Sequence, residues 1–128
     1  MFVLALLAGA AAGLAGLRVA GTEALIATSV VLFGVLLAGV RQWSAVAGLS
    51  LVAASAVFHG LAHGAELPAG AHFAAYALGF LGSTTVLHLA GLSLGGGVQQ
   101  LRRGVQPAVW RGLGLTLGAA GLLMLVRI

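Results

Sequence analysis

Apolar residues dominate this chain and fall into five long stretches separated by short segments that contain arginine, proline or glycine. The stretches cover roughly residues 2–17, 23–40, 43–66, 72–94 and 109–126. A helix that crosses a membrane needs about 20 apolar residues, and all but the first stretch come near or exceed that length. The pattern predicts an all-α membrane protein, a bundle of about five transmembrane helices with short loops, forming a single domain over residues 1–128.

The composition also favours a protein whose outer surface is covered by lipid. Hydrophobic residues make up 61% of the chain and charged residues 6%, whereas a soluble domain carries about 25% charged residues. The net charge of +4 comes from arginines near the predicted membrane boundaries. It does not form the basic face that a nucleic acid requires, so no nucleic-acid partner is expected. The absence of cysteine excludes disulfides and thiolate metal sites.

Local signals set the expected helix ends. Thr22 is expected to cap the second helix, with Glu23 in its first turn, where a carboxylate suits the helix dipole. Trp43 is expected to anchor the start of the third helix at the interface. Pro68 should end that helix, and Gly95-Gly96-Gly97 should end the fourth.

Pairs of glycines four residues apart predict close helix packing. This spacing places two small residues on one face, where a second helix can approach closely. The pairs are Gly9 with Gly13, Gly60 with Gly64, and Gly114 with Gly118.

The arginines predict an orientation in the inner (cytoplasmic) membrane of a bacterium. Loops on one side hold Arg41, Arg102, Arg103 and Arg111, while the other side holds Arg18 and Arg127. The positive-inside rule places the first group in the cytoplasm. Glu23, Glu66 and His72 then fall at the outer face.

A polar stripe interrupts the third apolar stretch. On a helix, His63 lies about 40° around the axis from His59, and Glu66 about 20° to the other side, with Ser55 nearby. Two imidazoles one turn apart can bind one ion, and a carboxylate can add an oxygen ligand or balance charge. The stripe predicts a site for a divalent ion that prefers nitrogen and oxygen donors, formed by His59, His63 and Glu66. The competing interpretation is that these side chains only bond to polar partners between helices.

Four further residues are candidates for a polar path or for support of this site: Glu23, His88, Ser55 and Thr84. Glu23 could equally be a capping carboxylate, and Thr84 and Thr85 could satisfy His88 locally. His72 is expected to be interfacial. The stripe is not a zinc-protease signature, because Gly60 stands where that signature has a glutamate. No enzyme activity and no bound organic cofactor are expected.

The segment FHGLAHGAE at residues 58–66 resembles the signature of the HupE/UreJ family, membrane proteins linked to nickel uptake for hydrogenase and urease. AYALGF at residues 75–80 and LHLAGL at residues 87–92 resemble the helix that follows in that family. The resemblance implies a permease that passes Ni²⁺, with Co²⁺ as a second candidate ion. It also implies that His59, His63 and Glu66 are functional, and Glu23 resembles an acidic position of the family.

The family also has a first helix with an HPxxGxDH motif, which this sequence does not contain. That part of the metal path is therefore expected to come from a segment outside this sequence or from a partner. A homo-oligomer of the chain is a further candidate assembly. Two alternatives to a permease stay open. One is a metal-binding assembly subunit that does not transport. The other is a membrane electron carrier whose histidines ligate haem, with His88 opposite His59 or His63.

Overall fold

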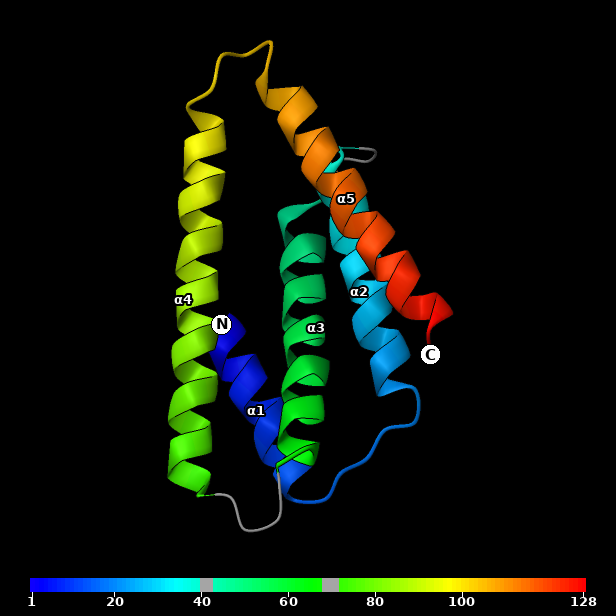
Figure 1. Ribbon diagram of the computed structural model, residues 1–128, viewed down its shortest axis with the longest axis vertical. Coiled ribbons are helices and arrows are strands. Elements are labelled where there is room, and N and C mark those ends of the chain that lie inside the picture. The colour runs from blue at the N-terminus through cyan, green and yellow to red at the C-terminus, as the bar shows by residue number, and fades with distance from the viewer. Residues whose placement is uncertain (40–42, 68–71) are drawn as a thin grey trace.

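The computed structural model describes residues 1–39, 43–67 and 72–128, which form five α-helices and no strand (Figure 1). The predicted all-α class is confirmed for these residues. The helices are α1 (Phe2–Leu14), α2 (Thr22–Leu37), α3 (Ala45–Ala65), α4 (Phe73–Gln99) and α5 (Gln106–Val126). In length and composition α3, α4 and α5 can cross a membrane, whereas α1 has 13 residues and α2 has 16. A bundle of five spanning helices therefore stays a prediction.

The helices α1 and α3 run parallel and touch along glycines. A Cβ atom added at Gly60 would overlap the carbonyl of Leu6, and one added at Gly64 would overlap the carbonyl of Ala10. From the other side, a Cβ atom at Gly9 would overlap the carbonyl of Val57. The predicted close packing at these glycines is confirmed, because only glycine allows the two backbones to lie so near each other.

The helices α2 and α5 form a second pair, which is antiparallel. Gly34 and Gly114 face each other with no room for a Cβ atom on either, and Gly121 lies against Val31. A Cβ atom at Gly118 would meet its nearest neighbour at 4.0 Å, which is an ordinary contact. A Cβ atom at Gly34, however, would overlap the backbone N and Cα of Gly118, so the predicted close packing at Gly114 and Gly118 is confirmed, and Gly121 joins it.

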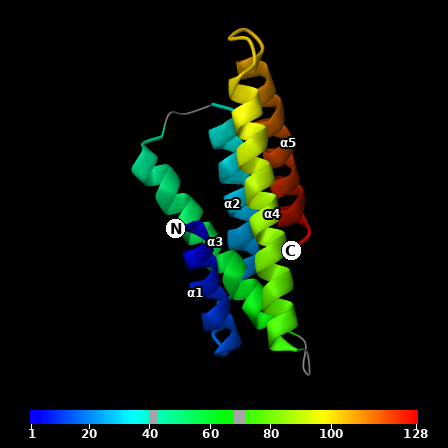
Figure 2. The same cartoon turned by 90° about the vertical axis from the view of Figure 1, so that its left-hand side faces the viewer.

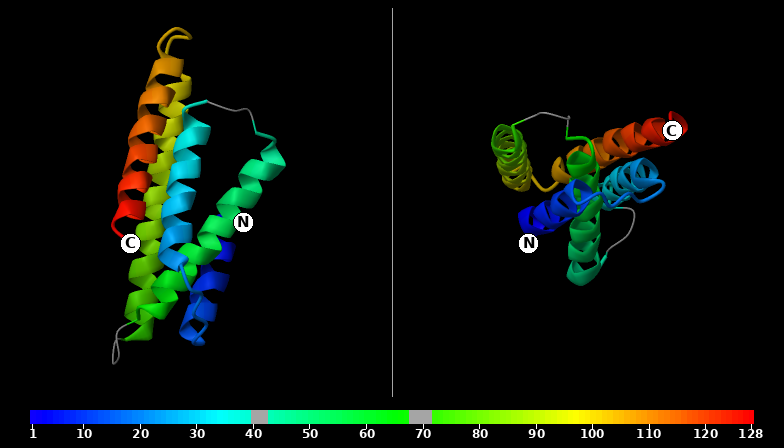
Figure 3. Two further views of the ribbon diagram at one scale, coloured as in Figure 1. Left: turned by 90° about the vertical axis from the view of Figure 1, so that its right-hand side faces the viewer. Right: turned by 90° about the horizontal axis from the view of Figure 1, so that it is seen from below.

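Helix α3 lies at the centre of the molecule, between α4 on one side and the α2–α5 pair on the other (Figure 1, and the view from below in Figure 3). Helices α2 and α3 approach each other where α2 begins and diverge toward the start of α3 (Figure 3, left). Helix α4 stands apart from α1 and α3 along most of its length (Figures 1 and 2). Large apolar side chains such as Leu78, Val86 and Leu87 are exposed on α4, as expected of a surface that faces lipid.

The predicted break at Gly95–Gly97 is wrong, because α4 continues through these glycines to Gln99. Glycine costs about 1 kcal/mol per residue in a helix. A continuing helix nevertheless satisfies its own backbone hydrogen bonds, which an apolar surrounding demands. Helix α5 begins at Gln106, three residues earlier than predicted, with proline in its first turn.

Thr22 is not the cap of α2. Gly21 takes that position with a φ of 77°, and the Thr22 hydroxyl donates instead to the Val19 carbonyl at 2.7 Å. The cap of α3 is Ser44, whose side chain accepts from the backbone N–H of Ala47 at 3.2 Å. The predicted helix ends at Arg41 and Pro68 lie outside the described residues.

Candidate metal site

The C-terminal half of α3 presents two different faces. Gly60 and Gly64 turn toward α1 and are buried. His59 and His63 lie on another face, which borders a hollow of about 460 Å³ between α2, α3 and the end of α5. His63 is half-buried and His59 is exposed to this hollow. The close contact of Gly60 and Gly64 with α1, the glycine seam, thus fixes the rotation of α3 about its own axis. This rotation brings His59 and His63 to the hollow.

Residues from three helices line this hollow. Helix α3 contributes His59, His63 and Glu66, and the N-terminal part of α2 contributes Glu23 and Ile26. The end of α5 adds residues that the sequence gave no reason to expect: Met124, Arg127 and Ile128. Of the predicted residues, His59, His63, Glu66 and Glu23 are therefore brought together.

The two imidazoles lie edge to face. The ring centroids of His59 and His63 are 4.8 Å apart, with an interplanar angle of 70°. On its other side the His63 ring lies 4.9 Å from the ring of Phe80 on α4, at 51°. The backbone carbonyl of His63 accepts a hydrogen bond of 2.7 Å from the hydroxyl of Tyr76, also on α4.

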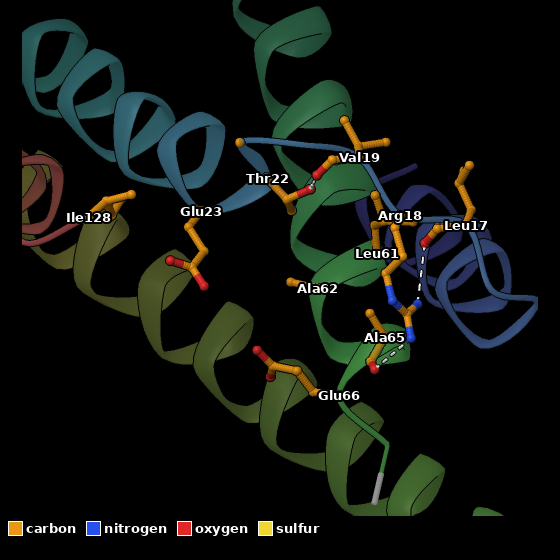
Figure 4. Close-up of a pocket in the computed structure, with 11 residues that line it drawn as sticks. Leu17, Arg18, Val19, Thr22, Glu23, Leu61, Ala62, Ala65, Glu66 and Ile128 are labelled. Carbon is orange, nitrogen blue, oxygen red and sulfur yellow. Dashed lines mark hydrogen bonds between the residues drawn. The ribbon is translucent and has the colours of Figure 1, made fainter.

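Glu66 and Glu23 approach the same space from different helices. Glu66 is the C-cap residue of α3, and Glu23 lies in the first turn of α2. Figure 4 shows the two side chains reaching toward the same opening, a second hollow of about 320 Å³. Because both carboxylates also line the first hollow, they stand between the two.

Arg18 lies beside the second hollow but turns away from the carboxylates (Figure 4). Its guanidinium donates to the carbonyls of Gly13 at 2.9 Å, Ala65 at 3.2 Å and Leu17 at 3.3 Å. Gly13 and Ala65 lie in the last turns of α1 and α3, where carbonyls lack partners within the helix. A cation there also suits the negative end of both helix dipoles.

The donors line the hollow without closing around a point. Among the described residues, no group of three or more histidine and acidic side chains is close enough to hold one ion together. Ligation of one ion by His59, His63 and Glu66 therefore requires their side chains to turn toward each other. The residue types fit a divalent ion that accepts nitrogen and oxygen ligands.

The other candidates lie elsewhere. The Ser55 hydroxyl donates to the Leu51 carbonyl of its own helix at 2.7 Å. The ring of His88 stacks on Phe2, with centroids 5.1 Å apart and an angle of 7°. Neither hollow is lined by Ser55, His88 or Thr84. His72 is the exposed N-cap residue of α4.

Sequence reasoning missed how α4 and α5 meet the end of α3. Met124 and Arg127 are three residues apart and so share a helix face, but nothing in the sequence pairs that face with the histidine stripe. The sequence predicts that Tyr76 lies near the start of a helix over residues 72–94. Its hydrogen bond to the His63 carbonyl joins two different helices and has no local signal in the sequence.

Comparison with known proteins identifies the family. The family model described as "HupE / UreJ protein" matches residues 1–124. The chain belongs to the HupE/UreJ family. The resemblance read from residues 58–66 is thereby confirmed. A curated HupE/UreJ relative, Protein HupE of Rhizobium leguminosarum bv. viciae, is 33% identical over 93 residues.

That alignment covers 73% of this chain and 49% of the relative, so the chain matches about half the length of the relative. No solved structure matches the chain.

Proposed function

We propose that this chain forms part of a permease for divalent nickel in the inner membrane of a bacterium, supplying metal for hydrogenase or urease maturation. The observation that carries the proposal is that His59, His63 and Glu66 border one hollow together with Glu23. Membership of the HupE/UreJ family supports nickel as the cargo.

Each donor has a role in this proposal. The imidazoles of His59 and His63 supply nitrogen ligands from one helix face, 4.8 Å apart between centroids. Glu66 and Glu23 supply oxygen ligands or balance the charge of the ion at the end of the hollow. The ion enters through the opening between these two carboxylates and meets the imidazoles deeper along α3.

The loose arrangement of the donors suits transport. An ion that must leave again requires few ligands and a moderate affinity. A site whose side chains turn inward only around an ion meets that requirement better than a rigid cage. Co²⁺ prefers the same donor types, and we propose it as a second cargo.

A metal-binding subunit without transport is the second candidate. One observation favours it: Ser55, Thr84 and His88, the predicted continuation of the polar path, line neither hollow. On this view, a second copy of the chain or a partner completes the path. A haem site has less support, because the His88 ring packs on Phe2.

Uptake of nickel-63 tests the proposal. Cells that lack other nickel uptake would express the chain, its His63→Ala variant or its His72→Ala variant, each together with a helix that carries the family's HPxxGxDH motif, with expression measured in each. We expect accumulation with the wild type and His72→Ala, and a strong loss with His63→Ala. Metal binding by the purified chain without accumulation in cells would select the subunit, and neither binding nor accumulation would reject both.

A further inference from the structure

The last turn of α3 is held by side chains from two other segments, helix α4 and the loop between α1 and α2. The Glu66 N–H pairs with the Ala62 carbonyl, and two of the carbonyls that follow it accept from side chains instead. The His63 carbonyl is taken by the Tyr76 hydroxyl at 2.7 Å, and the Ala65 carbonyl by Arg18 at 3.2 Å. The bond from Tyr76 is short and partly buried, so solvent competes with it weakly.

Tyr76 and Phe80 make one unit on α4. They are four residues apart, and their rings stack with centroids 6.4 Å apart and an angle of 11°. Phe80 in turn lies 4.9 Å from the imidazole of His63. One histidine is therefore contacted at both ends, its carbonyl by the Tyr76 hydroxyl and its ring by Phe80.

These contacts stand out because α4 otherwise meets the rest of the molecule little. Leu78, Leu87 and other large apolar side chains along it are exposed. The aromatic pair is thus where α4 engages the polar stripe of α3. His59, by contrast, makes its ring contact with His63 itself.

We propose that Tyr76 is a positioning residue for His63: its hydroxyl, with Phe80 behind the imidazole, fixes the side chain that the ion meets. This inference rests on the proposed function. Without the hydroxyl, the last turn of α3 frays more readily, and the imidazole samples orientations that do not face the hollow. Loss of one such bond should weaken ion binding about three- to tenfold.

Cobalt titration of the purified full chain in detergent tests this, because the d–d absorption of Co²⁺ reports the geometry of its ligands. The variants are Tyr76→Phe, His63→Ala and the double variant. Thr116→Val is the matched control, since it also removes one hydroxyl, which bonds within α5 to the Gly112 carbonyl at 2.9 Å.

We expect Tyr76→Phe to bind Co²⁺ three- to tenfold more weakly with altered d–d bands. Thr116→Val should bind as the wild type does, and the thermal unfolding midpoints of these two variants should be similar. In the His63→Ala background, Tyr76→Phe should add no further loss, because the group it positions is gone.

Two results would overturn the inference while leaving the proposed function intact. One is an unchanged affinity and spectrum in Tyr76→Phe beside a clear loss in His63→Ala. The other is an equal loss from Tyr76→Phe with and without His63, which would mean that Tyr76 does not act through the imidazole. If the wild type does not bind the ion, or His63→Ala binds equally well, the proposed function itself is rejected.

Discussion

The guanidinium of Arg18 and the carbonyl of Ala65, 47 residues apart in the sequence, are joined by a hydrogen bond of 3.2 Å. The same guanidinium reaches the Gly13 carbonyl at 2.9 Å. One side chain therefore ties the C-terminal ends of α1 and α3 together, directly before Glu66. The parallel course of these two helices makes this possible, since it brings two negative helix ends to one place.

Replacing Arg18 by glutamine should loosen this end of the α1–α3 pair. We expect the free energy of unfolding in detergent to fall by about 0.5–1 kcal/mol, because the bonds are largely exposed to solvent. Arg18→Lys should recover part of the loss, since lysine keeps the charge without the forked geometry. Arg103→Gln, in the exposed loop before α5, is the control, and an equal effect there would contradict a specific role of Arg18.

The glycine seam between α1 and α3 predicts a difference between two substitutions on α3. Gly60→Ala places a methyl group against the Leu6 carbonyl, whereas Gly48→Ala meets nothing within 4 Å. We expect Gly60→Ala to lower the free energy of unfolding by about 1–3 kcal/mol. Gly48→Ala should be neutral or stabilising by up to about 1 kcal/mol. Denaturant titration of both variants decides, and equal stabilities would show that the seam does not hold these helices together.

The distribution of arginines predicts that the loop with Arg102 and Arg103 is cytoplasmic. Because the chain has no cysteine, a single cysteine at Gln100 is the sole target of a thiol reagent. We expect Gln100→Cys in intact cells to resist a reagent that does not cross membranes. Val19→Cys, in the loop between α1 and α2, should react readily. The reverse labelling pattern would invert the orientation.

The sequence alone predicted the features that depend on neighbouring residues. Periodicity and apolar runs placed the five helices. The four-residue spacing of Gly60 and Gly64 identified the face of α3 that meets α1, and the polar stripe followed from the positions of His59 and His63.

What could not be predicted depends on contacts between distant segments or on competing energies. The glycines at 95–97 are read locally as a break, yet the hydrogen bonds of a continuing helix outweigh their cost. Arg18 was read as a boundary charge, although it bonds to the end of α3. Met124 and Arg127 join the hollow only because α5 packs antiparallel on α2.

The claim that the polar stripe of α3 binds the ion is tested most directly by calorimetric titration of Ni²⁺ into the purified chain. The series comprises the wild type, His59→Ala, His63→Ala, Glu66→Gln and, as control, His72→Ala at the exposed start of α4. We predict clear weakening in the first three variants, because each loses a donor that borders the hollow, and an unchanged affinity in His72→Ala. Equal affinities across the whole series, or a loss confined to His72→Ala, would contradict a metal site on α3.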